Sequence, residues 1–144
     1  KQHAKVSHTR HDHLHKISTE IYKNHAVIFV EDLKVANMSK SAKGTTDEPG
    51  RNVRAKSGLN KSILDQGWHK FRTLLAYKSM WQGGDVIAIP PQYTSQTCSS
   101  CGERSEKNRQ SQESFVCTKC SYAANADINA ARNILAAGLG RVGL

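Results

Sequence analysis

The segments Cys98-Ser-Ser-Cys101 and Cys117-Thr-Lys-Cys120 decide how this sequence is interpreted, because each carries two cysteines separated by two residues. The 15 residues between the pairs match the spacing of a four-cysteine zinc site built from two tight turns. Gly102 supplies the left-handed backbone that such turns often need. Four thiolates leave no ligand position for water, so the predicted zinc is structural and catalytic groups lie elsewhere. A redox-active cysteine pair is the alternative interpretation.

The composition is that of a basic chain with a modest core. Of the 144 residues, 21 are Lys or Arg and 12 are Asp or Glu, which gives a formal net charge of +9. This charge favours a polyanionic partner such as nucleic acid. The sequence shows no apolar run long enough for a membrane span and no signal-peptide pattern at its start. We therefore expect a reducing compartment, in which the cysteines bind metal instead of forming disulfides.

Hydrophobic periodicity predicts helices that alternate with strands, which places the chain in the α/β class. Two short β-branched runs without alternation are typical of strands covered on both faces of a parallel sheet. The predicted elements are a helix over residues 6–22 that ends near Asn24, a strand over 26–30, a flexible polar loop over 39–58, a helix over 59–81 with the apolar stripe Leu64, Trp68, Phe71 and Leu75, a strand over 85–89, and a helix over 126–137 that Gly138 ends.

Two acidic residues lie at the ends of predicted elements. Glu31 follows the first strand, and Asp127 begins the last helix. Reactive groups in open α/β sheets gather at the carboxyl ends of strands, and carboxylates that converge there can share divalent cations. Magnesium and manganese prefer such oxygen ligands. The alternative is that Glu31 is an exposed end-of-strand acid and that Asp127 only interacts with the helix dipole.

Four segments, in order, resemble the C-terminal half of TnpB-like proteins, which small bacterial insertion sequences encode and which are related to the compact type V CRISPR nucleases. The segments read VEDL at 30–33, YTSQTCSSCG at 93–102, CTKC at 117–120 and NADINAARNI at 125–134. The resemblance extends over nearly the whole chain, and TSQTCSSCG and DINAARNI are its specific parts. Ser121 departs from the family, which often has glycine after the second cysteine pair.

This resemblance implies a RuvC-like nuclease domain of the RNase H fold, interrupted by a zinc ribbon, that cleaves DNA under the direction of an RNA. It assigns residues 1–93 and 125–144 to a partial RuvC-like domain and residues 94–124 to the ribbon. Glu31 matches the second catalytic carboxylate, Asp127 matches the third, and the four cysteines match the zinc ligands. The implied partners are DNA and a guide RNA, the implied catalytic metal is magnesium or manganese, and the implied location is the bacterial cytoplasm at the nucleoid.

The first catalytic aspartate of the family has no match in this sequence. Asp32 is adjacent to Glu31 and would point to the other face of the strand. Asp85 follows the second carboxylate instead of preceding it, so its order is wrong. We therefore expect a fragment of a larger protein, which does not cleave DNA alone because one metal ligand is absent.

Two groups of side chains each admit two interpretations. The first group is the basic residues near the cysteine pairs, which either contact phosphate or belong to a solvated loop. These residues are Arg104, Lys107, Arg109 and Lys119. His8, His11 and His15 share one helical face, which is either a second metal site or a solvated basic face. The function that competes with a nuclease is a non-catalytic zinc-ribbon module that binds DNA or RNA.

Overall fold

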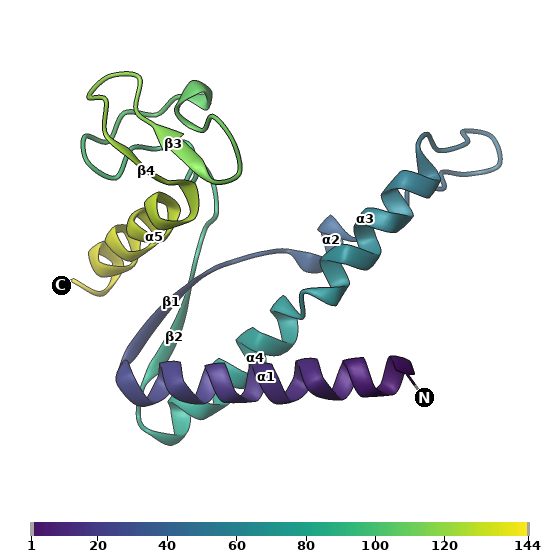
Figure 1. The fold of residues 1–144 in the computed structure, drawn as a ribbon, viewed down its shortest axis with the longest axis horizontal. Coiled ribbons are helices and arrows are strands. Elements are labelled where there is room, and N and C mark those ends of the chain that lie inside the picture. The colour runs from purple at the N-terminus through teal and green to yellow at the C-terminus, as the bar shows by residue number, and fades with distance from the viewer. Residues whose placement is uncertain (1, 144) are drawn as a thin grey trace. The chain divides into compact units, whose positions relative to one another are not determined.

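The computed structural model describes residues 2–143, with helices and strands that confirm the α/β class (Figure 1). Two compact units divide the chain, Lys1–Ile28 with Lys34–Val86 and Phe29–Leu33 with Ile87–Leu144. No helix in the described part combines the length and the apolar composition needed to cross a bilayer. The elements are α1 (Gln2–Asn24), β1 (Val27–Glu31), α2 (Val35–Met38), α3 (Val53–Asp65), α4 (Trp68–Trp81), β2 (Asp85–Ile89), a 3-10 turn (Glu106–Asn108), β3 (Ser114–Val116), β4 (Ala123–Asn125) and α5 (Ala126–Val142).

The first unit is organised by the packing of α4 on α1. Lys78 of α4 is buried, and its ammonium donates to the carbonyl of His15 at 2.7 Å, to Ser18 Oγ at 2.8 Å and to Thr19 Oγ1 at 2.7 Å. Burial lowers the pKa of Lys78 from its ordinary value. Three oxygens on α1 therefore satisfy the three N–H donors of one buried cation, and this fixes how the two helices meet.

The single helix predicted over 59–81 is wrong, because the structure has two helices there. Gly67 has a φ of 69° and separates α3 from α4, and a left-handed residue of this kind ends a run of helical hydrogen bonds. Leu64, before the break, is 60% exposed, whereas Leu74 and Leu75, after it, are buried.

The segment predicted as a flexible loop over 39–58 includes the start of a helix and a hydrogen-bonded turn. Its last six residues belong to α3, which begins at Val53. Within the rest, the N–H of Gly50 donates to the carbonyl of Lys43 at 2.8 Å and closes a turn. Asn60 of α3 donates to the carbonyls of Ser39 and Lys40 at 2.9 and 3.0 Å. These hydrogen bonds to backbone carbonyls hold the segment in place, because it has few apolar residues to bury.

Strands β1 and β2 form a two-stranded sheet. The N–H of Asp85 donates to the carbonyl of Ala26, and the N–H of Asp32 donates to the carbonyl of Ile89, so the strands run in the same direction, as predicted. The expectation that both strands are covered on both faces is not met. Only Ile89 is buried among the ten strand residues, because the sheet has just two strands among the described residues.

Helix α5 does not end at Gly138, as the sequence predicted, but continues to Val142. Gly138 is buried inside the helix, where a Cβ atom would lie 2.3 Å from the ring of Phe29 on β1. The glycine therefore permits close packing of the helix on the strand. Gly143, with a φ of 72°, is the residue that ends the helix.

Replacing Gly138 by alanine is expected to destabilise the protein, and Gly140→Ala is the matched control. Overpacking against Phe29 costs about 1–3 kcal/mol, which exceeds the helix-propensity gain of about 0.5–1 kcal/mol. Nothing lies within 4 Å of a Cβ built at Gly140, so Gly140→Ala should be neutral or stabilising. Urea unfolding of both variants measures the difference, and equal stabilities would contradict the proposed contact.

Candidate metal centre and acidic pair

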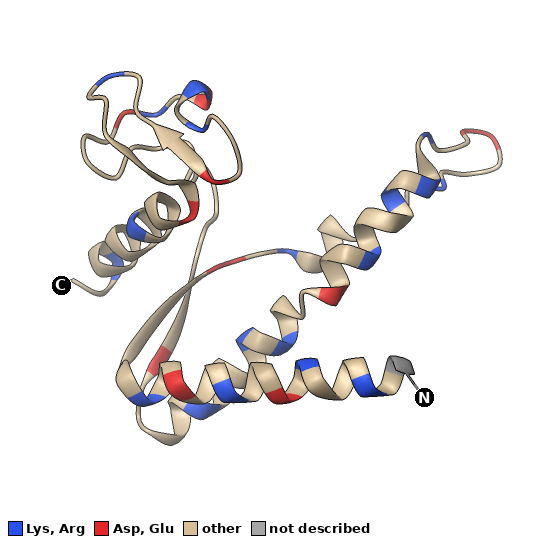
Figure 2. Ribbon diagram, in the orientation of Figure 1, with Lys and Arg blue, Asp and Glu red and all other residues tan. Residues whose placement is uncertain are grey.

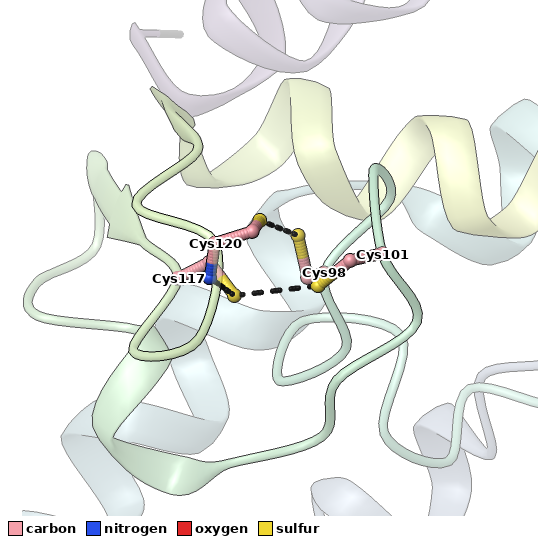
Figure 3. Close-up of side chains that lie close together, drawn as sticks. All are labelled: Cys98, Cys101, Cys117 and Cys120. Atoms are coloured by element: carbon pink, nitrogen blue, oxygen red, sulfur yellow. Dashed lines mark hydrogen bonds between the residues drawn. The ribbon is translucent and has the colours of Figure 1, made fainter.

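The four cysteines converge on one point. Their Sγ atoms all lie within 4.8 Å of one another, with Cys98 and Cys120 3.7 Å apart and Cys101 and Cys117 3.6 Å apart (Figure 3). Four sulfurs that each lie about 2.3 Å from a tetrahedral zinc ion are about 3.8 Å apart. The sulfur cage therefore has the size that one tetrahedral metal ion such as zinc requires.

Two similar turns present these sulfurs. The N–H of Gly102 donates to the carbonyl of Cys98 at 2.9 Å, and the N–H of Ser121 donates to the carbonyl of Cys117 at 3.1 Å. The residue after each pair is left-handed, with a φ of 76° at Gly102 and 57° at Ser121. This backbone explains why glycine suits both positions, and serine at 121 carries a steric cost that glycine would not.

The sulfur cage is also part of the only cluster of buried apolar residues found in the described chain. Cys98, Cys117, Phe115 and Ala126 form this cluster, and Tyr122 packs against it. Phe115 comes from the antiparallel pair of β3 and β4, where it lies opposite Ala124. Two of the four buried members are thus metal-ligand candidates, so a bound ion would complete the core itself.

The thiols of the cage do not ionise independently. The N–H groups of Cys120 and Lys119 donate to Cys117 Sγ and lower the pKa of Cys117 to about 7. The N–H of Glu103 acts in the same direction on Cys101, but Cys120 and the other sulfurs outweigh it and raise the pKa of Cys101 to about 12. Four thiolates at this distance repel one another, so a cation between them is needed for all to lose their protons.

Asn108 joins the two cysteine turns. Its amide donates to the carbonyls of Gln96 and Glu103 at 3.0 and 3.1 Å, on either side of the first cysteine pair. Its carbonyl oxygen accepts from the N–H and the hydroxyl of Thr118, within the second pair, at 2.9 and 3.0 Å. Asn108 is fully buried, and protein groups bond both polar atoms of its side chain.

Glu31 lies at the carboxyl end of β1 and is oriented by a hydrogen bond. Thr94 Oγ1 lies 3.0 Å from Glu31 Oε1 and 3.1 Å from the carbonyl oxygen of Pro91, so its one proton is available to either acceptor, and Thr94 itself is buried. The carbonyl of Thr94 accepts from Asn133 Nδ2 of α5 at 2.8 Å. Thr94 therefore connects the glutamate to the helix that carries Asp127.

Asp127 lies in the first turn of α5 and is exposed. Asn125 caps this turn, because its side-chain oxygen accepts from the N–H groups of Asp127 and Ile128 at 2.9 and 3.3 Å. Figure 2 shows acidic residues at the end of β1 and at the start of α5. Within residues 2–143, the four cysteines are the only group of three or more Cys, His, Asp or Glu close enough to share an ion, and neither acid belongs to such a group.

The four basic residues predicted around the cysteines have different surroundings. The guanidinium of Arg104 lies over the ring of Tyr93, and Lys119 Nζ lies 3.4 Å from Glu103 Oε2. Arg109 Nε donates to the carbonyl of Ser111 at 3.2 Å. Lys107 is exposed on the 3-10 turn. Arg104 and Lys119 are thus held by neighbours while remaining exposed.

Comparison with known proteins finds a matching family model and several similar proteins. Residues 68–134 match the model of the Cas12f1-like TNB domain. The chain is 62% identical over 136 residues to a protein of Escherichia coli strain K12 that is named as the RNA-guided DNA endonuclease InsQ. The aligned residues cover 94% of this chain and 34% of InsQ. It is 27% identical over 139 residues to the TnpB-like protein L79 of Acanthamoeba polyphaga mimivirus, with 96% of this chain and 25% of that protein covered.

The chain is TnpB-like. It spans about a third of the length of InsQ. A solved structure of Cas12f1 in complex with sgRNA and target DNA superposes with a TM-score of 0.58 at 22% identity, covering 91% of this chain and 34% of that one. This likeness shows that the TnpB-like chain shares the fold of the matching part of Cas12f1.

Sequence reasoning missed two asparagines of α5 that bind the backbone around the first cysteine pair. Asn129 accepts from the N–H of Ser99 at 3.0 Å and donates to the carbonyl of Thr97 at 2.8 Å, and Asn133 donates to the same carbonyl at 2.7 Å. The signal for this pair was available, because residues four apart on a helix share one face. Asn108 had no such signal, since its partners come from both cysteine turns.

Replacing Asn108 by alanine is expected to destabilise the region around the four cysteines by about 1–3 kcal/mol, the cost of leaving a buried polar group without a partner. The carbonyls of Gln96 and Glu103 keep backbone donors, from Ser105 and Cys98, so the N–H of Thr118 bears the loss. Guanidinium unfolding of the metal-loaded chain measures the effect. The exposed Gln110→Ala variant is the control, and an equal change in both would contradict the role of Asn108.

Proposed function

We propose that Glu31 and Asp127 are two of the carboxylate ligands for a catalytic pair of magnesium or manganese ions in an RNA-guided DNA endonuclease of the TnpB-like type. In this proposal the residues on β1, β2 and α5 belong to a RuvC-like domain of the RNase H fold, and residues 94–124 form its zinc ribbon. The names of the relatives support an endonuclease, and the position of Glu31 at the end of a parallel strand supports the ligand assignment.

The observation that carries the proposal is the bond from Thr94 to Glu31. A donor to Oε1 fixes the orientation of the carboxylate and leaves Oε2 without a hydrogen bond from Thr94. The same residue is bonded to Asn133 on α5, and Asp127 lies on that helix. An end-of-strand acid with only a solvating role would not need a buried threonine to orient it.

The donor set suits hard divalent cations, because both residues offer carboxylate oxygens. When bound, such ions supply an activated water molecule and stabilise the leaving oxygen of a phosphodiester. The role of the chain is positioning. Thr94 holds Glu31, Asn125 caps the helix turn that presents Asp127, and the close contact of Gly138 with Phe29 keeps α5 against β1.

Charge and the ribbon support nucleic acid as the partner. The net charge is +9, and exposed Arg104, Lys107 and Lys119 lie within the residues of the ribbon. We propose that these residues, with Arg109, contact the phosphate backbone of DNA or of a guide RNA. Because Arg104 lies on Tyr93 and Lys119 is near Glu103, their ordering would cost little additional entropy on binding.

The second candidate is a module that binds DNA or RNA through its ribbon without cutting. The observation that favours it is that the cysteine cage and Asn108 are complete without either acid. In that case Glu31 only accepts from Thr94, and Asp127 only stabilises the start of α5 through the helix dipole. Cleavage measurements separate the two functions.

In a TnpB-like protein of the relatives' full length that carries these residues, Glu31→Gln and Asp127→Asn are each expected to lower the rate of guided DNA cleavage about a hundredfold or more, because each removes a charged metal ligand. DNA binding measured by gel shift should be retained. Glu113→Gln changes an exposed acid by the same amount of charge and should leave cleavage unaltered.

Residues 1–144 by themselves are expected not to cleave DNA, since the family's first catalytic aspartate has no match among them. Metal-dependent cutting by this polypeptide, abolished by Glu31→Gln, would contradict the need for a further ligand. Unchanged cleavage in the Glu31 and Asp127 variants would refute the ligand assignment, whereas guide-dependent binding without any cleavage by the full-length protein would leave the binding module as the function.

Zinc is the ion that we assign to the cysteine cage, and its removal is expected to unfold the ribbon. The segment from Glu103 to Ser114 has no buried apolar side chain of its own, so the metal supplies its order. Metal analysis should give one zinc per chain. Chelation should expose Phe115 and leave the helical signal of α1 and α4 intact, as measured by circular dichroism. A zinc-free chain with the same ribbon stability would refute this assignment.

A further inference from the structure

Two imidazoles on α1 lie outside everything assigned above. His11 Nε2 and His15 Nε2 are 3.0 Å apart, and the two rings are inclined by 68° with centroids separated by 4.5 Å. The residues are four apart, so they occupy one face of the helix on successive turns. No other two of the seven histidines have this spacing in the sequence.

The separation of the two nitrogens suits one shared metal ion. Two nitrogens that each lie about 2.0–2.1 Å from an ion are about 2.9–3.4 Å apart at the angles of octahedral and tetrahedral coordination. Imidazole is a preferred ligand of zinc, nickel and copper, and poorly suited to magnesium or calcium. Both rings are half-buried, so water can reach the site and complete the coordination sphere.

The surroundings of the pair allow an ion to enter. His11 borders a hollow of about 660 Å³ that Ser7, Arg10 and Gln66 also line. Arg10 pairs with Asp65 at 3.0 Å, which offsets one of the nearby positive charges. Lys70 remains a cationic neighbour of His11, so the attraction comes from the nitrogen lone pairs and not from the local field.

We propose that His11 and His15 form a two-imidazole binding site for a transition-metal ion of the zinc, nickel and copper class, separate from the cysteine cage. The site lies beside the contact of α1 with α4, because the backbone carbonyl of His15 accepts from Lys78. A metal bound to both rings links two turns of α1 at this contact, and it stabilises the helix that α4 packs against.

The test uses the chain with zinc already bound to its cysteines and titrates Ni²⁺ at pH 7.5 in a calorimeter. We expect one Ni²⁺ to bind without release of zinc and to raise the melting temperature. His11→Gln and His15→Gln should each abolish this binding and the shift. Both variants should fold, since the contacts of α1 with Lys78 use the backbone of His15 and the hydroxyls of Ser18 and Thr19.

His13→Gln is the matched control, because it removes one imidazole from the same helix without touching the pair. It should bind Ni²⁺ as the unchanged chain does. The proposal is overturned if the unchanged chain takes up no Ni²⁺ beyond what displaces zinc. It is equally overturned if His11→Gln or His15→Gln binds as before, or if His13→Gln loses the same affinity. In those cases the two rings share only a hydrogen bond.

Discussion

The close approach of four cysteine sulfurs is the constraint on which the second unit depends. Its buried apolar cluster is small, and Cys98 and Cys117 belong to it. Between the cysteine pairs the chain is almost wholly polar, so apolar burial cannot offset the entropy of ordering it. Hydrogen bonding to Asn108 supplies part of this order, and a metal ion held by the four sulfurs would supply more.

That ordering extends beyond the ribbon through side-chain amides. Asn129 and Asn133 of α5 bind backbone groups of Thr97, Ser99 and Thr94, next to the first cysteine turn. Thr94 in turn orients Glu31 on β1. A chain of hydrogen bonds therefore links the cysteine region to Glu31, the candidate catalytic acid.

In the first unit a buried lysine, and not a cysteine cluster, organises the packing. Its helices carry few buried apolar residues, and the contact between α1 and α4 is centred on the buried ammonium of Lys78 with its three oxygen partners. Desolvation of this buried charge offsets much of the energy of its three hydrogen bonds.

Much of the site could be predicted from the sequence, because its signals are local. The spacing of the four cysteines predicted one shared centre, and the positions of Glu31 and Asp127 at element ends were predicted from hydrophobic runs. The end of α5 was predicted wrongly, since a glycine ends a helix or permits close packing depending on whether a partner such as Phe29 is present. The prediction of one long helix over 59–81 was wrong for a similar reason, because the left-handed backbone at Gly67 interrupts an otherwise helical pattern.

The sequence by itself determined the class of the protein, the cysteine cage and the resemblance to TnpB-like proteins, because residue type and spacing along the chain suffice for these. Only the tertiary structure decided that Thr94 orients Glu31, that Asn108 joins the two cysteine turns and that His11 faces His15. The first contact joins residues 63 positions apart and the second joins residues 5 to 12 positions apart in irregular segments, where spacing predicts nothing. The third needed the ring orientations, which helical periodicity alone does not fix.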